Sequence, residues 1–527
     1  MSTTIATALN SAINNFDDKI FIEDGELKLT FSDTQRLCHQ AAAALIGRGF
    51  ALGDRAAIWA PNITEWVLAA LAIHCAGGVV VPINSRFKGV EATEILATSG
   101  VKWLFSIGEF LNSDYPSQID RNQLSQLEGI VVLKGGSIAP HTTWLDWLSE
   151  GKQHLAVNPE QVNERSALVS GDDCSDIIFT SGTTGKAKGV ITTHQQNLRT
   201  FMTWSDLVGL DESDRYLIVN PFFQSFGYKA GILACLLKGC TLIPQLVFDV
   251  DEVLARIARD KITMLPGPPT LYQSLLAHPK LAEHDLSSLT KATTGAAVIP
   301  TELIDSIRNE LGITTVLTAY GLSESCGLAT MCRHGDPSAT IASTSGRAIP
   351  GIEVACLHSD GRRCDADEIG EIVIRGFNVM QGYLDNPEAT AESIDSAGWL
   401  HTGDIGSLDG DGNLKITDRL KDMYISGGFN CYPAEIESSL NRHPSIVMSA
   451  VIGTAETLMG EVGAAFIQST DPQLTADLMH QWCRTNMANY KVPKHFVFVD
   501  NLPLNATGKI HKPTLREIWS QRQLPSV

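Results

Sequence analysis

The segment Thr180-Ser-Gly-Thr-Thr-Gly-Lys-Ala-Lys-Gly189 directly follows a short apolar run at residues 177–179. Glycines let the backbone come close to an anion, and exposed N–H groups and hydroxyls can then surround phosphate oxygens. Lys186 or Lys188 would supply positive charge. The spacing differs from that of a Walker loop, and a mobile surface loop has a similar composition. The segment therefore predicts an anion site at the end of a buried strand.

Around this loop, strand-like and helix-like stretches alternate. Short apolar runs predict strands at residues 56–60, 79–83, 177–179 and 263–265, and stretches with helical character predict helices at 65–76 and 253–259. This rhythm favours an α/β fold with parallel sheets covered by helices. The most apolar stretch, residues 66–83, contains His74 and two glycines, so we interpret it as a helix and a core strand rather than a membrane span.

A second module begins after a predicted tight turn at residues 409–413. Its pattern predicts helices at 433–442 and 473–487, and strands at 446–452, 462–467 and 495–499. We place the boundary near Arg419, which gives an N-terminal domain of residues 1–418 and a C-terminal domain of residues 419–527.

Composition limits the classes of partner. The net charge of −19 in 527 residues argues against a nucleic-acid binder, which normally carries a basic face. The eleven cysteines are irregularly spaced without a C-x-x-C pair, which predicts reduced, mostly buried thiols and a cytoplasmic protein rather than a zinc site. The N-terminus lacks the features of a signal peptide, so none is expected.

Four further strings follow in the chain. They are Gly295-Ala-Ala297, Tyr320-Gly-Leu-Ser-Glu324, Trp399-Leu-His-Thr-Gly-Asp404 and Asn501-Leu-Pro-Leu-Asn-Ala-Thr-Gly-Lys509. Together with the glycine-rich loop, and in this order, they resemble the motifs of the adenylate-forming superfamily, which includes acyl-CoA synthetases. The resemblance implies a large N-terminal domain of stacked βαβ sheets plus a distorted β-barrel, and a small mobile α+β lid.

The resemblance also implies the residues that bind ATP. They are Thr180, Ser181, Gly182, Thr183, Thr184, Gly185, Lys186, Gly295, Ala296, Ala297, Ala319, Tyr320, Gly321, Leu322, Ser323, Asp404, Arg419 and Lys509. Tyr320 would pack on adenine, and the carboxylate of Asp404 would accept hydrogen bonds from the ribose. Glu324, a hard carboxylate ligand, would bind Mg²⁺. Thr180, Glu324 and Lys509 are the expected catalytic residues.

Lys509 matches the lysine that enters the site from the lid during adenylation. Its compact charge suits contact with both the carboxylate and the α-phosphate. Lys421 matches the hinge of the lid, although a hinge needs only backbone freedom. Ser426, Gly427 and Gly428 match the lid segment that faces the coenzyme A tunnel after rotation.

The acyl pocket is expected around the segment after Pro221. The pocket and tunnel residues implied there and elsewhere are Phe223, Gln224, Phe226, Gly227, Lys229, Gly295 and Gly321. Gln224 stands where many members have histidine, and glutamine cannot carry a proton. Residues 225–231 are expected to form a strand-to-helix turn. Lys229 could contact a polar group of the substrate, but a structural role is the favoured interpretation.

The expected activity is ATP-dependent formation of an acyl-adenylate, then acyl transfer to coenzyme A. One alternative is loading of a carrier protein, although residues 222–225 lack the acidic residue of amino-acid-specific members. Others are a non-catalytic nucleotide-binding protein and a luciferase-like oxygenase. Residues 222–231 and 265–271 look like those of ligases for medium or long aliphatic or alicyclic acids, especially ring-bearing propanoates from steroid breakdown. A homodimer is a family-level expectation.

Overall fold

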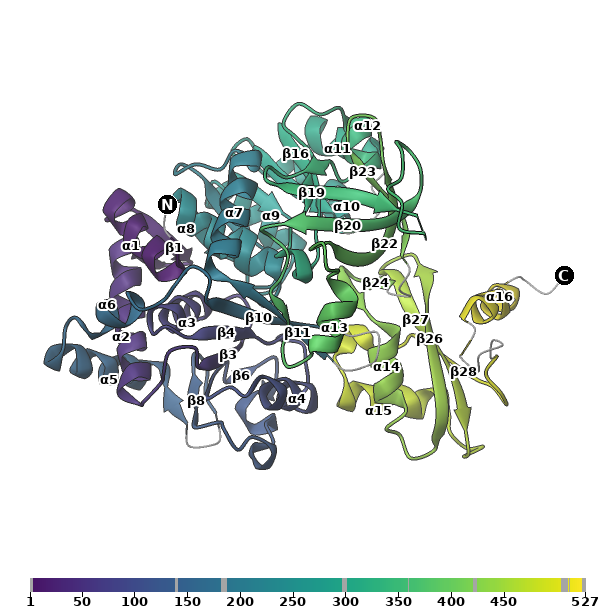
Figure 1. Ribbon diagram of the computed structural model, residues 1–527, viewed down its shortest axis with the longest axis horizontal. Helices are drawn as coiled ribbons and strands as arrows, with labels where there is room; N and C mark the ends of the chain where they lie inside the picture. The colour runs from purple at the N-terminus through teal and green to yellow at the C-terminus, as the bar shows by residue number, and fades with distance from the viewer. Residues whose placement is uncertain are drawn as a thin grey trace. The chain divides into compact units, whose positions relative to one another are not determined.

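The computed structural model describes residues 3–137, 141–181, 187–295, 301–358, 360–419, 424–503, 510 and 512–523. The chain divides into two compact units (Figure 1). The large unit comprises Met1–Ser85, Ile95–Phe179 and Gly189–Asp418, and the small unit comprises Arg86–Glu94, Thr180–Lys188 and Arg419–Val527.

Two sheets, mostly of parallel strands, dominate the large unit among the described residues. In spatial order, one contains β18 (Arg347–Ala348), β17 (Thr330–Met331), β16 (Thr315–Tyr320), β15 (Lys291–Gly295), β14 (Met264–Pro266), β12 (Arg215–Ile218), β13 (Thr241–Pro244), β1 (Ile20–Asp24) and β2 (Leu27–Thr30). The other contains β21 (Gly382–Tyr383), β11 (Ala187–Thr193), β10 (Cys174–Ser181), β4 (Val79–Pro82), β3 (Arg55–Trp59), β5 (Trp103–Ser106), β8 (Gly129–Val132) and β9 (Thr142–Thr143). The expected parallel βαβ architecture is confirmed.

Helices flank these strands (Figure 1). They are α1 (Ile5–Phe16), α2 (Phe31–Gly47), α3 (Thr64–Cys75), α5 (Trp144–Val157), α6 (Gln161–Ser166), α7 (His194–Val208), α8 (Ala234–Lys238), α9 (Val250–Arg259), α10 (Pro269–Leu276), α11 (Thr301–Asn309), α12 (Ser338–Ser343) and α13 (Pro387–Ser393), while α4 (Gly89–Ser99) has residues in both units. The sequence explains where α7 begins and ends. Thr193 forms a capping box with Gln196 at its N-terminus, and Gly209, at φ 76°, ends it.

Helix α3 and strand β4 account for the most apolar stretch of the sequence. All of α3 except Glu65 is buried, and β4 is buried on both faces. A helix that is apolar all round belongs in a core. Among the described residues, the helices are too short or too polar to cross a membrane.

A third sheet of the large unit is antiparallel and lies where the resemblance implies a distorted barrel. It contains β19 (Ile352–Leu357), β20 (Gly370–Gly376), β22 (Leu400–Leu408) and β23 (Leu414–Arg419). Its buried face includes Val354, Ile372, Ile374 and Leu400, which pack in one cluster with Tyr320 and Tyr383 from the two larger sheets. This shared core brings the ends of β16, β21 and β22 together. A small ribbon, β6 (Glu109–Phe110) with β7 (Ser113–Asp114), completes the described strands of the large unit.

The small unit is an α+β module. Its sheet contains β25 (Phe429–Cys431), β24 (Tyr424–Ser426), β27 (Gly460–Ser469) and β26 (Ile446–Glu456), with β28 (His495–Phe498) parallel to β27, and its helices are α14 (Pro433–Leu440), α15 (Ala476–Asn486) and α16 (Lys512–Gln523). The predicted helices and strands of this module are confirmed. Two apolar clusters cover the two faces of the sheet, one of them around Ile436, Val451 and Met479.

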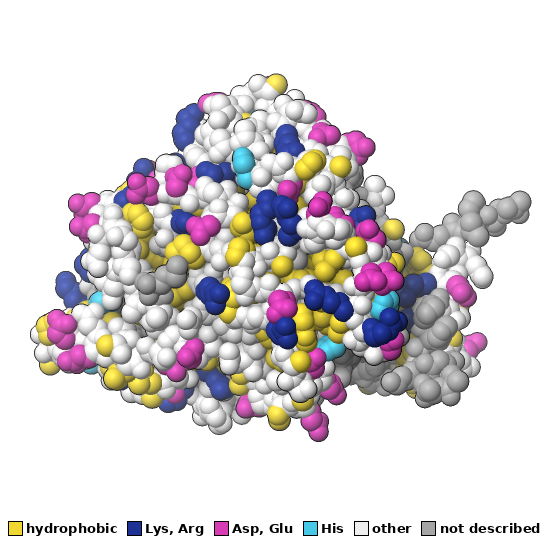
Figure 2. Space-filling view, turned by 45° about the horizontal axis from the view of Figure 1, so that its top comes forward, with side chains coloured by type: hydrophobic (Ala, Val, Ile, Leu, Met, Phe, Trp, Pro, Cys, Tyr) yellow, Lys and Arg dark blue, Asp and Glu magenta, His cyan; other side chains and the backbone are white. Residues whose placement is uncertain are grey.

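The burial of most thiols agrees with the expectation from composition. Acidic and basic side chains are interspersed over the face in Figure 2. The eleven cysteines are free thiols, of which nine are buried, and only Cys174 and Cys364 are partly exposed. Burial raises the pKa of most of the nine buried thiols, for example to about 12 for Cys326, so these buried thiols stay protonated and inert.

Candidate active site

Strand β10 carries Thr180 at the edge of the glycine-rich loop. The Thr180 hydroxyl donates to the backbone carbonyl of Lys188 at 3.5 Å, close to where β11 begins. The residues expected to grip phosphate, Gly182, Thr183, Thr184, Gly185 and Lys186, lie outside the described residues, as does the side chain of Ser181. The structure therefore places the two strands that bound the loop.

Tyr320 and Asp404 come from separate motifs and meet in the structure. Tyr320 is the last residue of β16, and its hydroxyl donates to Asp404 Oδ2 on β22 at 2.6 Å. A charge-assisted bond of this length fixes both side chains. The residue expected at adenine and the residue expected at ribose are thus 84 positions apart in sequence and in direct contact.

Glu324 is held by a second tyrosine. It lies in a single 3₁₀ turn, Ser323–Ser325, and Tyr383 Oη donates to its Oε1 at 2.8 Å. The backbone N–H of Met380 also donates to the Glu324 carbonyl at 2.8 Å. Tyr383 is in β21, which pairs antiparallel with β11 at Val190. The strand that follows the glycine-rich loop thereby positions the expected metal ligand.

Close backbone packing explains Gly321 in the same motif. A Cβ on Gly321 would lie 2.4 Å from the carbonyl carbon of Gly327. Because that atom belongs to the backbone, a larger side chain would require the main chain to move. Cys326 adopts φ 56° to complete the turn. Leu322 and Ser323 are in the same turn. The turn thus keeps β16 and Glu324 at a fixed separation.

Gly295 ends β15 beside Ala319 of β16. The two residues are in register, and a Cβ on Gly295 would lie 3.1 Å from the Ala319 carbonyl oxygen. Small residues here let the ends of the two strands lie close together. Ala296 and Ala297 lie outside the described residues.

The segment before Asp404 is fixed by Glu371 on β20. One oxygen of Glu371 accepts from the Gly403 N–H at 3.1 Å, and the other contacts His401 Nδ1 at 2.9 Å. His401 Nε2 lies 3.6 Å from Asp395. Burial opposes the charged imidazole, but the two carboxylates outweigh it and raise the pKa of His401. Sequence reasoning did not find Glu371, because only pairing of β20 with β22 brings it here.

The segment after β12 is clamped by Asn62. The Asn62 amide donates to the carbonyls of Ile218 and Asn220 at 3.2 and 2.9 Å, and its oxygen accepts from the Phe222 N–H at 2.8 Å. Phe222 and Phe223 are buried, whereas Gln224 is half-buried. Asn62 lies 160 residues before Phe222 in the chain and was not expected in the site.

The expected strand-to-helix turn at residues 225–231 is a π-helix, Phe226–Leu233, which runs into α8. Glycine allows it to pack closely, because a Cβ on Gly227 would lie 2.1 Å from the Pro221 carbonyl oxygen. Such wide turns are rare and are frequent at functional sites. Apolar periodicity does not distinguish a π-helix from an α-helix, so the sequence could not predict it.

The placement of Lys229 in the acyl pocket needs correction. Its side chain is 1% exposed, and its ammonium lies 2.9 Å from Asp176 Oδ1 and 3.0 Å from Thr192 Oγ1. Asn197 and Ser175 also donate to Asp176. The Lys229 ammonium therefore lies in the core, where it neutralises the buried carboxylate of Asp176. This agrees with the structural role that the sequence favoured for Lys229.

The lid residues that can be described form a tight hairpin in the small unit. Ser426 ends β24, Gly427 and Gly428 take φ values of 55° and 81°, and β25 follows. Both glycines occupy the left-handed region that other residues avoid. Arg419 is the last residue of β23, and its side chain, like the whole of Lys421 and Lys509, lies outside the described residues.

Comparison with known proteins identifies the family. The AMP-binding enzyme family matches residues 9–384, and the AMP-binding enzyme C-terminal domain matches residues 435–509. A 7a-methyl-1,5-dioxo-octahydro-1H-inden-4-yl propanoyl:CoA ligase of Mycobacterium tuberculosis is 46% identical over 98% of this chain and 99% of its own. The ligase of the same name from Rhodococcus jostii is 45% identical, with 98% of each chain covered.

Solved structures give the same result. The o-succinylbenzoate CoA synthetase of Bacillus subtilis, bound with a product analogue, is 27% identical with a TM-score of 0.80, over 97% of this chain and 98% of its own. A fatty acyl CoA synthetase of Mycobacterium tuberculosis is 29% identical with a TM-score of 0.69, over 99% of both chains. The expected adenylate-forming fold is confirmed, and the chain belongs to the AMP-binding enzyme family as an acid–thiol ligase that uses ATP and coenzyme A.

Proposed function

We propose that this ligase activates a bulky alicyclic propanoate of the kind produced by steroid breakdown. The observation that carries the proposal is the 46% and 45% identity to two ligases for one bicyclic propanoate, over nearly the whole chain. The buried aromatic residues Phe222 and Phe223 make the segment beside the π-helix apolar, which supports an acyl site for such an acid.

In the proposed reaction, the substrate carboxylate attacks the α-phosphate of ATP, forms an acyl-adenylate and releases pyrophosphate. The thiol of coenzyme A then attacks the acyl carbon, and AMP leaves. Tyr320 and Asp404 hold the adenosine, since their hydrogen bond orients both groups before the nucleotide binds. Lys509 stabilises the charge that develops during adenylation, and Thr180 with the glycine-rich loop holds the departing phosphates.

Mg²⁺ fits beside Glu324 in this scheme. The Tyr383 hydroxyl donates to Glu324 Oε1 and orients the carboxylate. The half-buried Glu324 side chain still has free lone pairs that can bind a hard cation. When bound, the ion would neutralise triphosphate charge. A cytoplasmic location and a homodimer stay predictions.

A panel of carboxylates tests the substrate class, read by pyrophosphate release and by mass spectrometry of the CoA thioester. The panel contains a bicyclic diketo-propanoate, the same ring system without ketones, octanoate, palmitate and ferulate. We expect the bicyclic acids to exceed the others in kcat/KM by about tenfold or more, since a shaped apolar pocket discriminates on that scale. Preference for a linear or aryl acid would contradict the substrate class while leaving the ligase activity intact.

A further assay addresses the acyl acceptor. Free coenzyme A and a phosphopantetheinylated carrier protein compete for the preformed acyl-adenylate, and we expect the thioester to form on free coenzyme A. Loading of the carrier protein alone would favour the alternative acceptor.

A further inference from the structure

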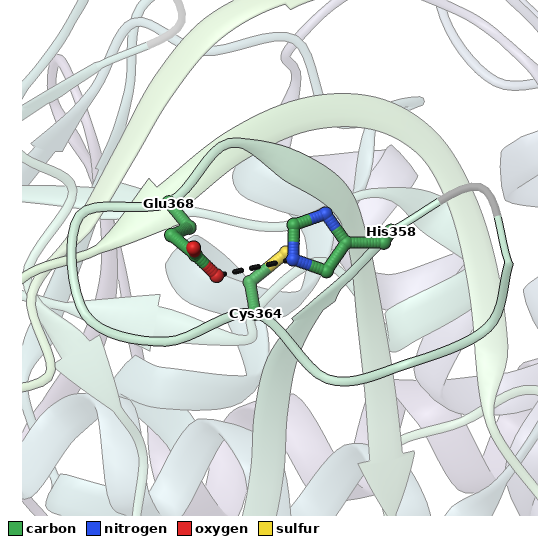
Figure 3. A group of neighbouring side chains, drawn as sticks. All are labelled: His358, Cys364 and Glu368. Carbon is green, nitrogen blue, oxygen red and sulfur yellow. Dashed lines mark hydrogen bonds and ion pairs between the residues drawn. The ribbon is translucent and has the colours of Figure 1, made fainter.

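A group of three potential metal ligands lies outside the active site, in the loop between β19 and β20. The ligand atoms of His358, Cys364 and Glu368 all lie within 4.8 Å of one another, and His358 Nε2 is 3.0 Å from Glu368 Oε2. Figure 3 shows the three side chains pointing toward one another from this one loop. They combine an imidazole, a thiol and a carboxylate, which makes the group more specific than an acidic cluster.

The backbone around these side chains is held by several hydrogen bonds. The His358 N–H donates to the Arg362 carbonyl, and the Cys364 N–H donates to the Cys356 carbonyl, each at 2.8 Å. Glu368 Oε2 also accepts from the Asp365 N–H at 2.8 Å. The loop therefore brings the three side chains together before any ligand arrives, which reduces the ordering that binding would require.

The Cys364 thiol occupies a space that depends on a neighbouring glycine. A Cβ on Gly370 would lie 2.6 Å from Cys364 Sγ, so glycine at the start of β20 leaves the space that the sulfur occupies. The His358 and Glu368 side chains are 28% and 49% exposed, which gives an ion access from solvent. Arg362, a nearby cation in sequence, is paired with Asp360 at 2.8 Å.

We propose, contrary to the expectation from the cysteine spacing, that His358, Cys364 and Glu368 form a Zn²⁺ site with a fourth position open to water. A soft thiolate beside an imidazole selects against Mg²⁺ and Ca²⁺, which prefer oxygen ligands only. A tetrahedral zinc ion with bonds of about 2.0–2.3 Å needs its ligand atoms about 3.4–3.8 Å apart, which small side-chain shifts from the present separations achieve. The thiolate and the carboxylate together supply two negative charges, which balance the ion.

The site would fasten the β19–β20 connection. β20 pairs with β22, the strand that carries Asp404, so the ion would act on the stability of the third sheet rather than on the reacting atoms.

Co²⁺ titration of the metal-free full-length protein tests the site directly. We expect one equivalent of Co²⁺ to give a thiolate-to-cobalt charge-transfer band, and Zn²⁺ to displace it. Cys364→Ser should abolish the band, and His358→Gln or Glu368→Gln should weaken binding by at least about tenfold. Circular dichroism reports whether each variant is folded, and Zn²⁺ should raise the thermal midpoint of the wild type but not of Cys364→Ser.

Cys174→Ser is the matched control, because Cys174 is the other partly exposed thiol. It should keep the band and the Zn²⁺-dependent thermal shift. Absence of a thiolate band in the wild type, or a band that survives Cys364→Ser and disappears in Cys174→Ser, would overturn the assignment.

Discussion

At the scale of single residues, the site depends on two tyrosines that each hold a carboxylate. Tyr320 donates to Asp404 at 2.6 Å and Tyr383 donates to Glu324 at 2.8 Å. Both tyrosine side chains are only 8% exposed, so both hydroxyls reach their carboxylates from within the core. The two carboxylates are consequently oriented before any nucleotide binds.

Removal of the Tyr383 hydroxyl tests the second pair. A hydrogen bond to a charged group contributes about 1.5–3 kcal/mol, so Tyr383→Phe should lower kcat/KM for ATP by about tenfold or more. Because Glu324 loses its orientation, the Mg²⁺ concentration for half-maximal pyrophosphate release should rise.

The control for that change is Tyr115→Phe. The Tyr115 hydroxyl donates to the backbone carbonyl of Ser85 at 2.7 Å, away from the expected ligands. It should leave the Mg²⁺ dependence unchanged. An equal response in both variants would show that Tyr383 acts only through general stability.

Lys509→Ala separates the two half-reactions at a single side chain. Loss of one group that stabilises developing charge costs about 10²–10³-fold in rate, so adenylation should fall on that scale. Conversion of supplied acyl-adenylate and coenzyme A to thioester should be retained, as measured by mass spectrometry. Equal loss of both half-reactions would contradict the proposed role.

At the scale of secondary-structure elements, a buried ion pair joins the π-helix to β10 and β11. Lys229 comes from the π-helix, Asp176 from β10 and Thr192 from β11. Removal of one partner from such a pair leaves an uncompensated charge and costs about 3–5 kcal/mol. Lys229→Met should therefore lower the thermal midpoint of the protein sharply, as measured by circular dichroism.

An exposed ion pair provides the comparison. Lys261 and Asp285 are 61% and 54% exposed, so Lys261→Met should leave the thermal midpoint nearly unchanged. Asp176→Asn combined with Lys229→Met should recover part of the loss, because no charge is left buried. A stable Lys229→Met single variant would refute the structural role.

The β20–β22 pair predicts a pH dependence through His401. Since Glu371 and Asp395 raise its pKa against the effect of burial, the stabilisation is fully present below the unfolded value of about 6.5. It is lost as pH rises through the folded pKa. The wild type should thus exceed His401→Gln in free energy of unfolding most clearly in mild acid, by less than about 1 kcal/mol. The difference in thermal midpoint between the two should shrink above neutrality. A difference that grows with pH would have the wrong sign.

The sequence predicted the elements better than their partners. Periodicity and flanking turn residues located α3, β4, α14 and β26, because each carries its own local pattern. Asn62, Glu371 and Tyr383 were missed, since each reaches the site only through a pairing or packing contact with a distant segment. The motif residues Tyr320 and Asp404 were identified by resemblance, but their direct hydrogen bond was not.

At the scale of the whole molecule, the division between Asp418 and Arg419 lies near the hinge that the family resemblance implies for a mobile lid. Lys421 lies just beyond this division and outside the described residues. Lys421→Pro fixes φ there, so it should spare adenylation and slow thioester formation. Single-turnover assays of each half-reaction measure both effects.

Lys421→Ala is the control, because a hinge needs backbone freedom rather than a lysine side chain. It should support both half-reactions at close to the wild-type rate. An unchanged overall rate in Lys421→Pro would show that Lys421 is not the hinge.

Because most thiols are buried, their reaction with an alkylating reagent can report local unfolding of the protein. Nine cysteines are buried and spread through both units, while Cys174 and Cys364 alone are partly accessible. An alkylating reagent applied to the native enzyme should therefore modify two positions at most, and each further adduct marks the opening of a particular part of the core. Peptide mapping over time would rank the regions of the chain by local stability, without any label being introduced.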